Sequence, residues 1–184
     1  DISDPDSPLP HTLASPRHFA QYVGARGISA DDTIVVYDGP GFFSAPRAWW
    51  MFRIMGVFQV FILEGGLDGW KAAGRRVTNE QTRIAPCVFH ADFDAGRVAG
   101  LDDVRQIVET GEVQVADARS PGRFAGIDPE PRAGVRGGHM PGARNVPASA
   151  LSENGMLLPK SRLREIVEGA GIDLSRPVVT SCGS

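Results

Sequence analysis

The chain has 184 residues, of which 42% are hydrophobic and 22% are charged, a composition that is ordinary for a globular protein. Its formal net charge of −3 argues against nucleic acid as a partner. It contains no apolar run near the ~18 residues that span a bilayer. The two cysteines, Cys87 and Cys182, form no CxxC pair or Cys/His cluster, so we expect no zinc site and no disulfide-stapled secreted domain. A reducing compartment, the cytoplasm, is expected.

The first half of the sequence alternates expected helices and strands. Ser15-Pro16 is typical of a helix N-cap followed by proline at the first helical position, and the helix ends at glycines from Gly24 onward. A strand is then expected at residues 33–37, a largely apolar helix from residue 44, a strand at 57–63 and a short helix that ends near Gly74. This order predicts a βαβ arrangement with a parallel sheet.

The second half repeats this pattern after an irregular stretch. We expect an N-terminal domain over residues 1–78, a linker over 79–97 and a C-terminal domain over 98–184. The expected elements are a helix at 101–108, a strand at 113–117, a long Gly/Pro/Arg loop, a short strand at 144–146, a helix at 161–170 and a strand that ends at Cys182. The two halves are therefore interpreted as diverged copies of one α/β unit, a tandem repeat.

Each copy is expected to be incomplete. The first begins with a helix and lacks the opening strands of its sheet, and the second ends on a strand with no helix after it. Two half-sheets of this kind would expose unpaired edges and apolar faces. We therefore expect the native polypeptide to extend at both ends, which an intact-mass measurement tests.

Cys182 is the first candidate for chemistry. Residues 177–182 predict a buried strand of a parallel sheet, and ligands bind at the carboxyl edge of such sheets. The small residues Gly183 and Ser184 leave backbone N–H groups that can face the sulfur and hold it as a thiolate. The alternative, which is the commoner one for an isolated cysteine, is a small hydrophobic residue of the strand. The position at the end of the strand favours a nucleophile.

The loop that begins at Asp117 should reach the same sheet edge. We choose Arg123 and Arg132 as the side chains that hold a carboxylate, because the planar guanidinium matches both carboxylate oxygens. For Arg119 we favour a scaffold role in an ion pair with Asp117, and His139 is expected to be structural. The alternative for the whole loop is a solvated basic surface.

Several separated motifs resemble the two-domain rhodanese-like sulfurtransferases, and most closely the 3-mercaptopyruvate sulfurtransferases. These motifs lie at residues 44–50, 117–119, 122–124, 130–132, 138–143 and 182–184. The resemblance implies an α/β fold with two tandem rhodanese-like domains, each a parallel sheet flanked by helices, both incomplete in this chain. Thiosulfate-preferring relatives place bulky basic residues directly after the cysteine, so Gly183 and Ser184 favour 3-mercaptopyruvate.

The resemblance also implies roles for individual residues. Cys182 would be the nucleophile that becomes a persulfide, and Arg123 and Arg132 would hold the carboxylate and carbonyl of the donor. Gly183 would belong to the substrate-binding loop, and Ser184 would donate or relay a hydrogen bond near the sulfur.

In the first copy, His11 matches a family histidine that acts with this serine across the cleft. From the sequence alone, a surface histidine after a proline turn is the alternative. Asp38 takes the place that corresponds to Cys182, so the first copy is expected to be catalytically silent, with Ser44 and Arg47 capping and pairing rather than catalysing.

The implied reaction moves sulfur from 3-mercaptopyruvate, through a cysteine persulfide, to a thiol or cyanide and releases pyruvate, with no metal or organic cofactor. The expected partners are this donor and a thiol acceptor such as a thioredoxin-like protein or a small thiol, with no nucleic acid and no membrane. The alternatives are a thiosulfate:cyanide sulfurtransferase and a persulfide-relay module without small-donor turnover. A phosphatase-like use of the loop is disfavoured by the Gly-Ser that follows Cys182.

Overall fold

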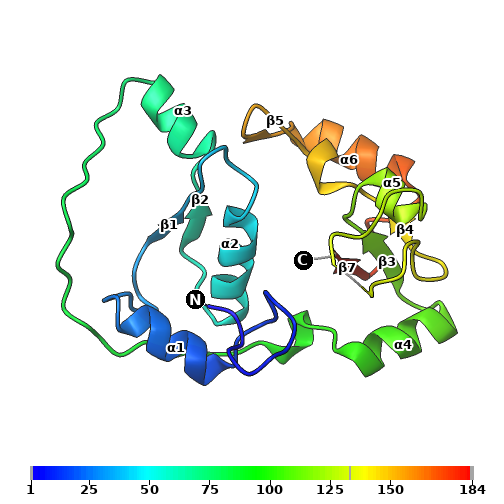
Figure 1. Cartoon of the computed structure of the whole chain (residues 1–184), viewed down its shortest axis with the longest axis horizontal. Helices are drawn as coiled ribbons and strands as arrows, with labels where there is room; N and C mark the ends of the chain where they lie inside the picture. Colours follow the sequence, from blue (N-terminus) through cyan, green and yellow to red (C-terminus); the bar gives the residue numbers. More distant parts are fainter. Residues whose placement is uncertain (1, 133, 183–184) are drawn as a thin grey trace. The chain divides into compact units, whose positions relative to one another are not determined.

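The computed structural model describes residues 2–132 and 134–182, which fall into two compact units (Figure 1). The first unit holds the residues up to Val98 together with the short segment Asn154–Met156. The second unit holds Ala99–Glu153 and the described residues from Leu157 to Cys182.

The first unit contains the expected alternation of helices and strands. Its elements are α1 (Pro16–Gly24), β1 (Ile34–Val36), α2 (Ala45–Ile54), β2 (Val60–Ile62), α3 (Gly66–Ala72) and the 3₁₀ helix η1 (Ala95–Arg97). The hydroxyl of Ser15 accepts the backbone N–H of His18 at 3.2 Å, which confirms the predicted cap of α1. Strands β1 and β2 pair in parallel with Ile34 opposite Val60, as the βαβ pattern predicts.

Three phenylalanines form the centre of the core of this unit. The ring of Phe19 on α1 meets Phe52 on α2 and Phe89 edge-to-face, with centroid distances of 5.1 and 5.6 Å. Phe89 is only 5% exposed, and the backbone N–H of Cys87 donates to the carbonyl of Gly24 at 2.9 Å. The sequence assigns both residues to a linker, but burial of the Phe89 ring attaches this end of the segment to the first unit. The part that directly follows α3 is extended (Figure 1).

The start of α2 is capped by Asp38 and not by Ser44, whose side chain makes no capping hydrogen bond. One carboxylate oxygen of Asp38 accepts the backbone N–H groups of Phe43, Ser44 and Ala45 at 2.9, 2.7 and 2.9 Å, and the other accepts that of Gly41. Burial opposes ionisation, but these bonds outweigh it and hold the pKa of Asp38 below its usual value. A full negative charge interacts more favourably with the dipole at a helix N-terminus than a hydroxyl does. This explains why Asp38 takes the place of the expected cap.

The second unit is built on a parallel sheet with the strand order β4-β3-β7. Its elements are α4 (Leu101–Thr110), β3 (Gln114–Asp117), α5 (Pro121–Phe124), β4 (Arg144–Asn145), η2 (Ala148–Ala150), β5 (Ser152–Glu153), β6 (Met156–Leu157), α6 (Lys160–Gly169) and β7 (Val178–Ser181). Ala116 of β3, Val146 and Ile172 form a small core, against which Val167 of α6 packs.

The second unit differs from the sequence prediction in three places. The loop after β3 contains the short helix α5, which Ser120 caps by accepting the N–H of Arg123 at 3.4 Å. A small hairpin, β5–β6, turns at Asn154 and Gly155, which both have positive φ and are grouped with the first unit. The expected burial of the last strand is wrong, because β7 pairs with β3 alone among the described residues, and Val178 is 39% exposed.

Within the described residues, no helix has both the length and the apolar character needed to cross a bilayer.

Candidate functional site

Cys182 lies directly after β7, at the carboxyl edge of the second sheet. In the parallel register, Ser181 is opposite Asp117, and the carbonyl of Ser181 accepts the N–H of Ala118 at 2.8 Å. The residue before Cys182 is therefore hydrogen-bonded to Ala118, the first residue after β3. Cys182 is exposed, whereas Gly183 and Ser184, the other two predicted loop residues, lie outside the described residues.

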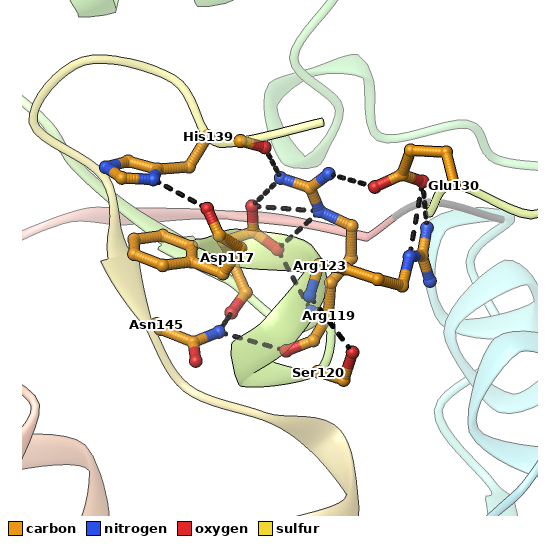
Figure 2. A network of polar contacts seen from close by, with 9 residues as sticks. Asp117, Arg119, Ser120, Arg123, Glu130, His139 and Asn145 are labelled. Carbon is orange, nitrogen blue, oxygen red and sulfur yellow. Dashed lines mark hydrogen bonds and ion pairs between the residues drawn. The ribbon is translucent and has the colours of Figure 1, made fainter. Parts of the chain in front are cut away.

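Asp117 and Arg119 form a buried ion pair at this edge (Figure 2). The Asp117 side chain is 1% exposed, and its closest contact is 2.6 Å from Oδ2 to Nη2 of Arg119. The Nε and the backbone N–H of Arg119 also donate to this carboxylate, each at 3.0 Å to Oδ1. Burial raises the pKa of Asp117, but the bonds from Arg119 outweigh that effect and leave the pKa below its usual value. The predicted scaffold pairing of Arg119 is confirmed.

Glu130 joins this pair to Arg123. Its Oε1 accepts Nη1 of Arg119 at 2.9 Å, and its Oε2 accepts Nη2 and Nε of Arg123 at 2.6 and 3.2 Å (Figure 2). The Glu130 side chain is only 5% exposed. The hydrogen bond from Arg123, and then the charges of both arginines, hold the pKa of Glu130 below its usual value. Sequence reasoning gave Glu130 no role in the site, although Glu130 lies in the motif at residues 130–132 and is an acid among arginines.

The turn that contains His139 anchors the network on its other side. The His139 ring stacks on Phe124 with a centroid distance of 3.7 Å and an interplanar angle of 7°, and Nδ1 lies 2.8 Å from the carbonyl oxygen of Phe124. The carbonyl of Gly138 accepts Nη2 of Arg119 at 2.7 Å. Asn145 of β4 donates its amide to the carbonyls of Asp117 and Arg119 (Figure 2). These contacts confirm the structural role expected for His139.

The network is balanced in charge, since two carboxylates face two guanidinium groups. Arg132, the second arginine predicted to bind a carboxylate, is half-buried in the bend that follows Glu130. No group of three or more His, Cys, Asp or Glu side chains that could hold a metal ion occurs within residues 2–132 and 134–182. The edge therefore combines an exposed thiol with ordered guanidinium groups, an arrangement suited to a small anionic ligand.

His11, the remaining predicted site residue, belongs to the first unit, whereas Cys182 belongs to the second. His11 is exposed and has a φ of 62°, in the left-handed region that non-glycine residues rarely adopt. Nη2 of Arg47 on α2 donates to the carbonyl of His11 at 2.6 Å and to that of Thr12 at 3.3 Å. Arg47 therefore stabilises the backbone of the His11 turn, in keeping with the pairing role predicted for it.

Comparison with known proteins gives matches over nearly the whole chain. Residues 3–73 match the model of the rhodanese-like domain. The chain is 38% identical to the human 3-mercaptopyruvate sulfurtransferase over 185 residues, which cover 99% of this chain and 62% of that protein. It is 40% identical to the thiosulfate sulfurtransferase of Cricetulus griseus, covering 97% of this chain and 62% of the relative. The chain thus spans 62% of the length of each of these relatives.

A solved structure extends the likeness to the fold. The crystal structure of SseA from Escherichia coli, described as a 3-mercaptopyruvate sulfotransferase with the rhodanese fold, superposes with a TM-score of 0.88 at 37% identity. The match covers 98% of this chain and 68% of SseA. The predicted α/β class and the predicted resemblance are confirmed: the chain belongs to the rhodanese-like sulfurtransferase family.

Proposed function

We propose that the protein is a sulfurtransferase that takes sulfur from 3-mercaptopyruvate, holds it as a persulfide on Cys182 and passes it to a thiol or to cyanide. The observation that carries this proposal is the exposed cysteine directly after β7, beside a loop in which buried carboxylates order two arginines. The identity to the human 3-mercaptopyruvate sulfurtransferase supports the choice of donor.

In the first half-reaction, the Cys182 thiolate attacks the thiol sulfur of the donor. An S–S bond forms, the C–S bond of the donor breaks, and its electron pair leaves as the enolate of pyruvate. The enolate carbon takes up one proton, which balances the proton that the donor sulfur releases when the persulfide ionises. The products are pyruvate and an enzyme persulfide.

In the second half-reaction, a thiolate or cyanide attacks the outer sulfur of the persulfide. The new bond forms as the S–S bond breaks, and Cys182 returns as a thiolate. The acceptor leaves as its own persulfide, or as thiocyanate when it is cyanide. A reduced thiol as acceptor favours a reducing compartment, and we propose the cytoplasm.

The remaining site residues have roles that we propose on the strength of the family likeness. Arg123 and Arg132 hold the carboxylate and carbonyl of the donor, and Gly183 belongs to the loop that binds it. Ser184 donates a hydrogen bond near the sulfur, with His11 as its proton-carrying partner.

We also propose that the two units are diverged copies of one domain, with boundaries near residues 78 and 98. A polar or reactive residue follows a parallel strand in each unit, Asp38 after β1 and Cys182 after β7.

Replacement of Cys182 with Ser tests the proposal. The hydroxyl is not ionised at neutral pH, so pyruvate release from 3-mercaptopyruvate should fall to background. Cys87→Ser is the matched control, because Cys87 is the other exposed cysteine, and it should retain the wild-type rate. Pyruvate release is followed by a coupled lactate dehydrogenase assay. Turnover that persists in Cys182→Ser would refute the assignment.

A second candidate is a thiosulfate:cyanide sulfurtransferase, which the 40% identity to the thiosulfate sulfurtransferase of Cricetulus griseus favours. The donor with the larger kcat/KM in the wild-type protein decides between the two enzymes. A relay module would instead release no pyruvate from 3-mercaptopyruvate and would gain its persulfide only from a partner protein.

A further inference from the structure

We infer that Glu130 is a positioning residue that orients the guanidinium group of Arg123 toward the carboxylate of a ketoacid ligand. This inference rests on the proposed function and deepens it, since it assigns the selectivity for a carboxylate donor to a residue that does not itself contact the donor.

The geometry of Arg123 leaves one part of its guanidinium group available to a ligand. Oε2 of Glu130 accepts hydrogen bonds from both Nη2 and Nε of Arg123. Nη1 of Arg123 makes no hydrogen bond within the part of the chain that the structure describes. The Arg123 side chain is 21% exposed, so solvent or a small ligand can reach it. Glu130 thus holds one side of the group and leaves the other side for an anion.

Glu130 is itself held firmly, unlike the glutamates of the surface ion pairs. Its second oxygen binds Arg119, which is locked onto the buried Asp117 at the end of β3. The ion pair of Glu168 with Arg164 on α6 is also short, at 2.8 Å, but its side chains are 46% and 57% exposed. A pair exposed to that degree orders its arginine weakly. The contacts from Asp117 through Arg119 and Glu130 to Arg123 connect the arginine to the strand beside β7.

Removal of the Glu130 charge has two opposing effects on anion binding. Arg123 loses its fixed orientation, which weakens a ligand that needs a directed bond to a planar carboxylate. The loop also gains net positive charge, which strengthens attraction to any anion. Thiosulfate has no carboxylate and presents its oxygens in several directions, so for thiosulfate the gain in charge outweighs the loss of orientation. The two effects therefore separate a ketoacid from thiosulfate.

The test compares the affinities for pyruvate and for thiosulfate in the Cys182→Ser background, where neither ligand exchanges sulfur. Glu130→Gln should lower the affinity for pyruvate relative to thiosulfate by about tenfold, as expected when a directed contact is misplaced. Glu168→Gln is the matched control, because it makes the same substitution in an exposed pair of the same unit, and it should leave the ratio unchanged. Isothermal titration calorimetry gives both dissociation constants. A ratio for Glu130→Gln equal to that of the control overturns the inference.

Two further variants keep the test decisive if Glu130→Gln fails to fold, which circular dichroism shows. Glu130→Asp keeps the charge but is one methylene too short to hold both arginines, and it should lower the same ratio. Arg123→Lys leaves Glu130 intact and should also lose pyruvate affinity while keeping that for thiosulfate. Pyruvate affinity that survives in Arg123→Lys overturns the inference.

Failure of the inference and failure of the proposed function have different signatures. A wild-type protein that releases no pyruvate from 3-mercaptopyruvate, but binds pyruvate in a manner that depends on Glu130, loses the proposed reaction and keeps the inference. A wild-type protein that releases pyruvate, with an unchanged ligand ratio in Glu130→Gln, keeps the reaction and loses the inference.

Discussion

Replacement of Asp117 with Asn should destabilise the second unit strongly. The substitution keeps the volume of the side chain but removes the negative charge from a group that is 1% exposed. Arg119 then loses its contact of 2.6 Å at Oδ2, where an amide NH2 group would face its own donors, and its charge keeps Glu130 as the one carboxylate partner that the structure describes.

The magnitude follows from the contacts that remain. Breaking a buried ion pair costs about 3 to 5 kcal/mol, because the surviving charge is left without compensation. Glu130 still compensates part of the charge of Arg119, so we expect the lower end, about 3 kcal/mol. With a urea m-value of about 1 to 1.5 kcal/mol/M for a small unit, the unfolding midpoint should fall by about 2 to 3 M.

Urea unfolding followed by far-UV circular dichroism measures this shift. All three tryptophans, Trp49, Trp50 and Trp70, lie in the first unit, so their fluorescence reports that unit separately. Asp102→Asn is the control, because Asp102 is 94% exposed in its pair with Arg105, and it should change the free energy of unfolding by less than about 1 kcal/mol. A midpoint for Asp117→Asn within about 0.5 M of that control would contradict the reasoning, because it would mean that the pair adds no more stability than a surface pair.

Two further predictions concern stability. Phe89→Ala should lower the free energy of unfolding of the first unit by about 3 kcal/mol, because Phe89 packs against Phe19 and Phe52. Tryptophan fluorescence in urea measures this loss, and Val88→Ala, at a side chain that is 70% exposed, is the control. A loss for Phe89→Ala no larger than the small loss expected for the control would show that the segment is only a linker. The second prediction concerns pH. The pKa values of Asp38, Asp117 and Glu130 are lowered on folding, so the stability that they add is present at neutral pH and is lost as the pH falls through the folded values. The urea midpoint should therefore fall between about pH 5 and about pH 3, and less steeply in Asp117→Asn, whereas equal slopes would contradict this assignment.

The sheet edge was predictable because its signals are local. A β-branched run that ends at Cys182 and a second run that ends at Asp117 predict two strands, and the parallel register aligns their ends. The Asn154-Gly155 pair is a strong hairpin signal that the sequence analysis overlooked, and both residues have positive φ in the structure.

Long-range partners were harder to predict. Glu130 and Arg123 are seven positions apart in a loop, where no periodicity indicates which side chains meet. Asp38 caps α2 from seven positions before Ala45, whose backbone N–H donates to its carboxylate. By sequence, Ser44 occupies the usual cap position. Burial of Phe89 depends on the gap between two helices, which no local pattern reveals.

The loop that follows Asp38 is an anion-binding site that a side chain of the same chain already fills. Its four backbone donors are occupied by a tethered carboxylate, whose effective concentration exceeds that of dissolved anions at ordinary levels. A dissolved anion therefore meets backbone donors that the Asp38 carboxylate already occupies. Exchange of Asp38 for a residue without a carboxylate would therefore vacate all four donors at once.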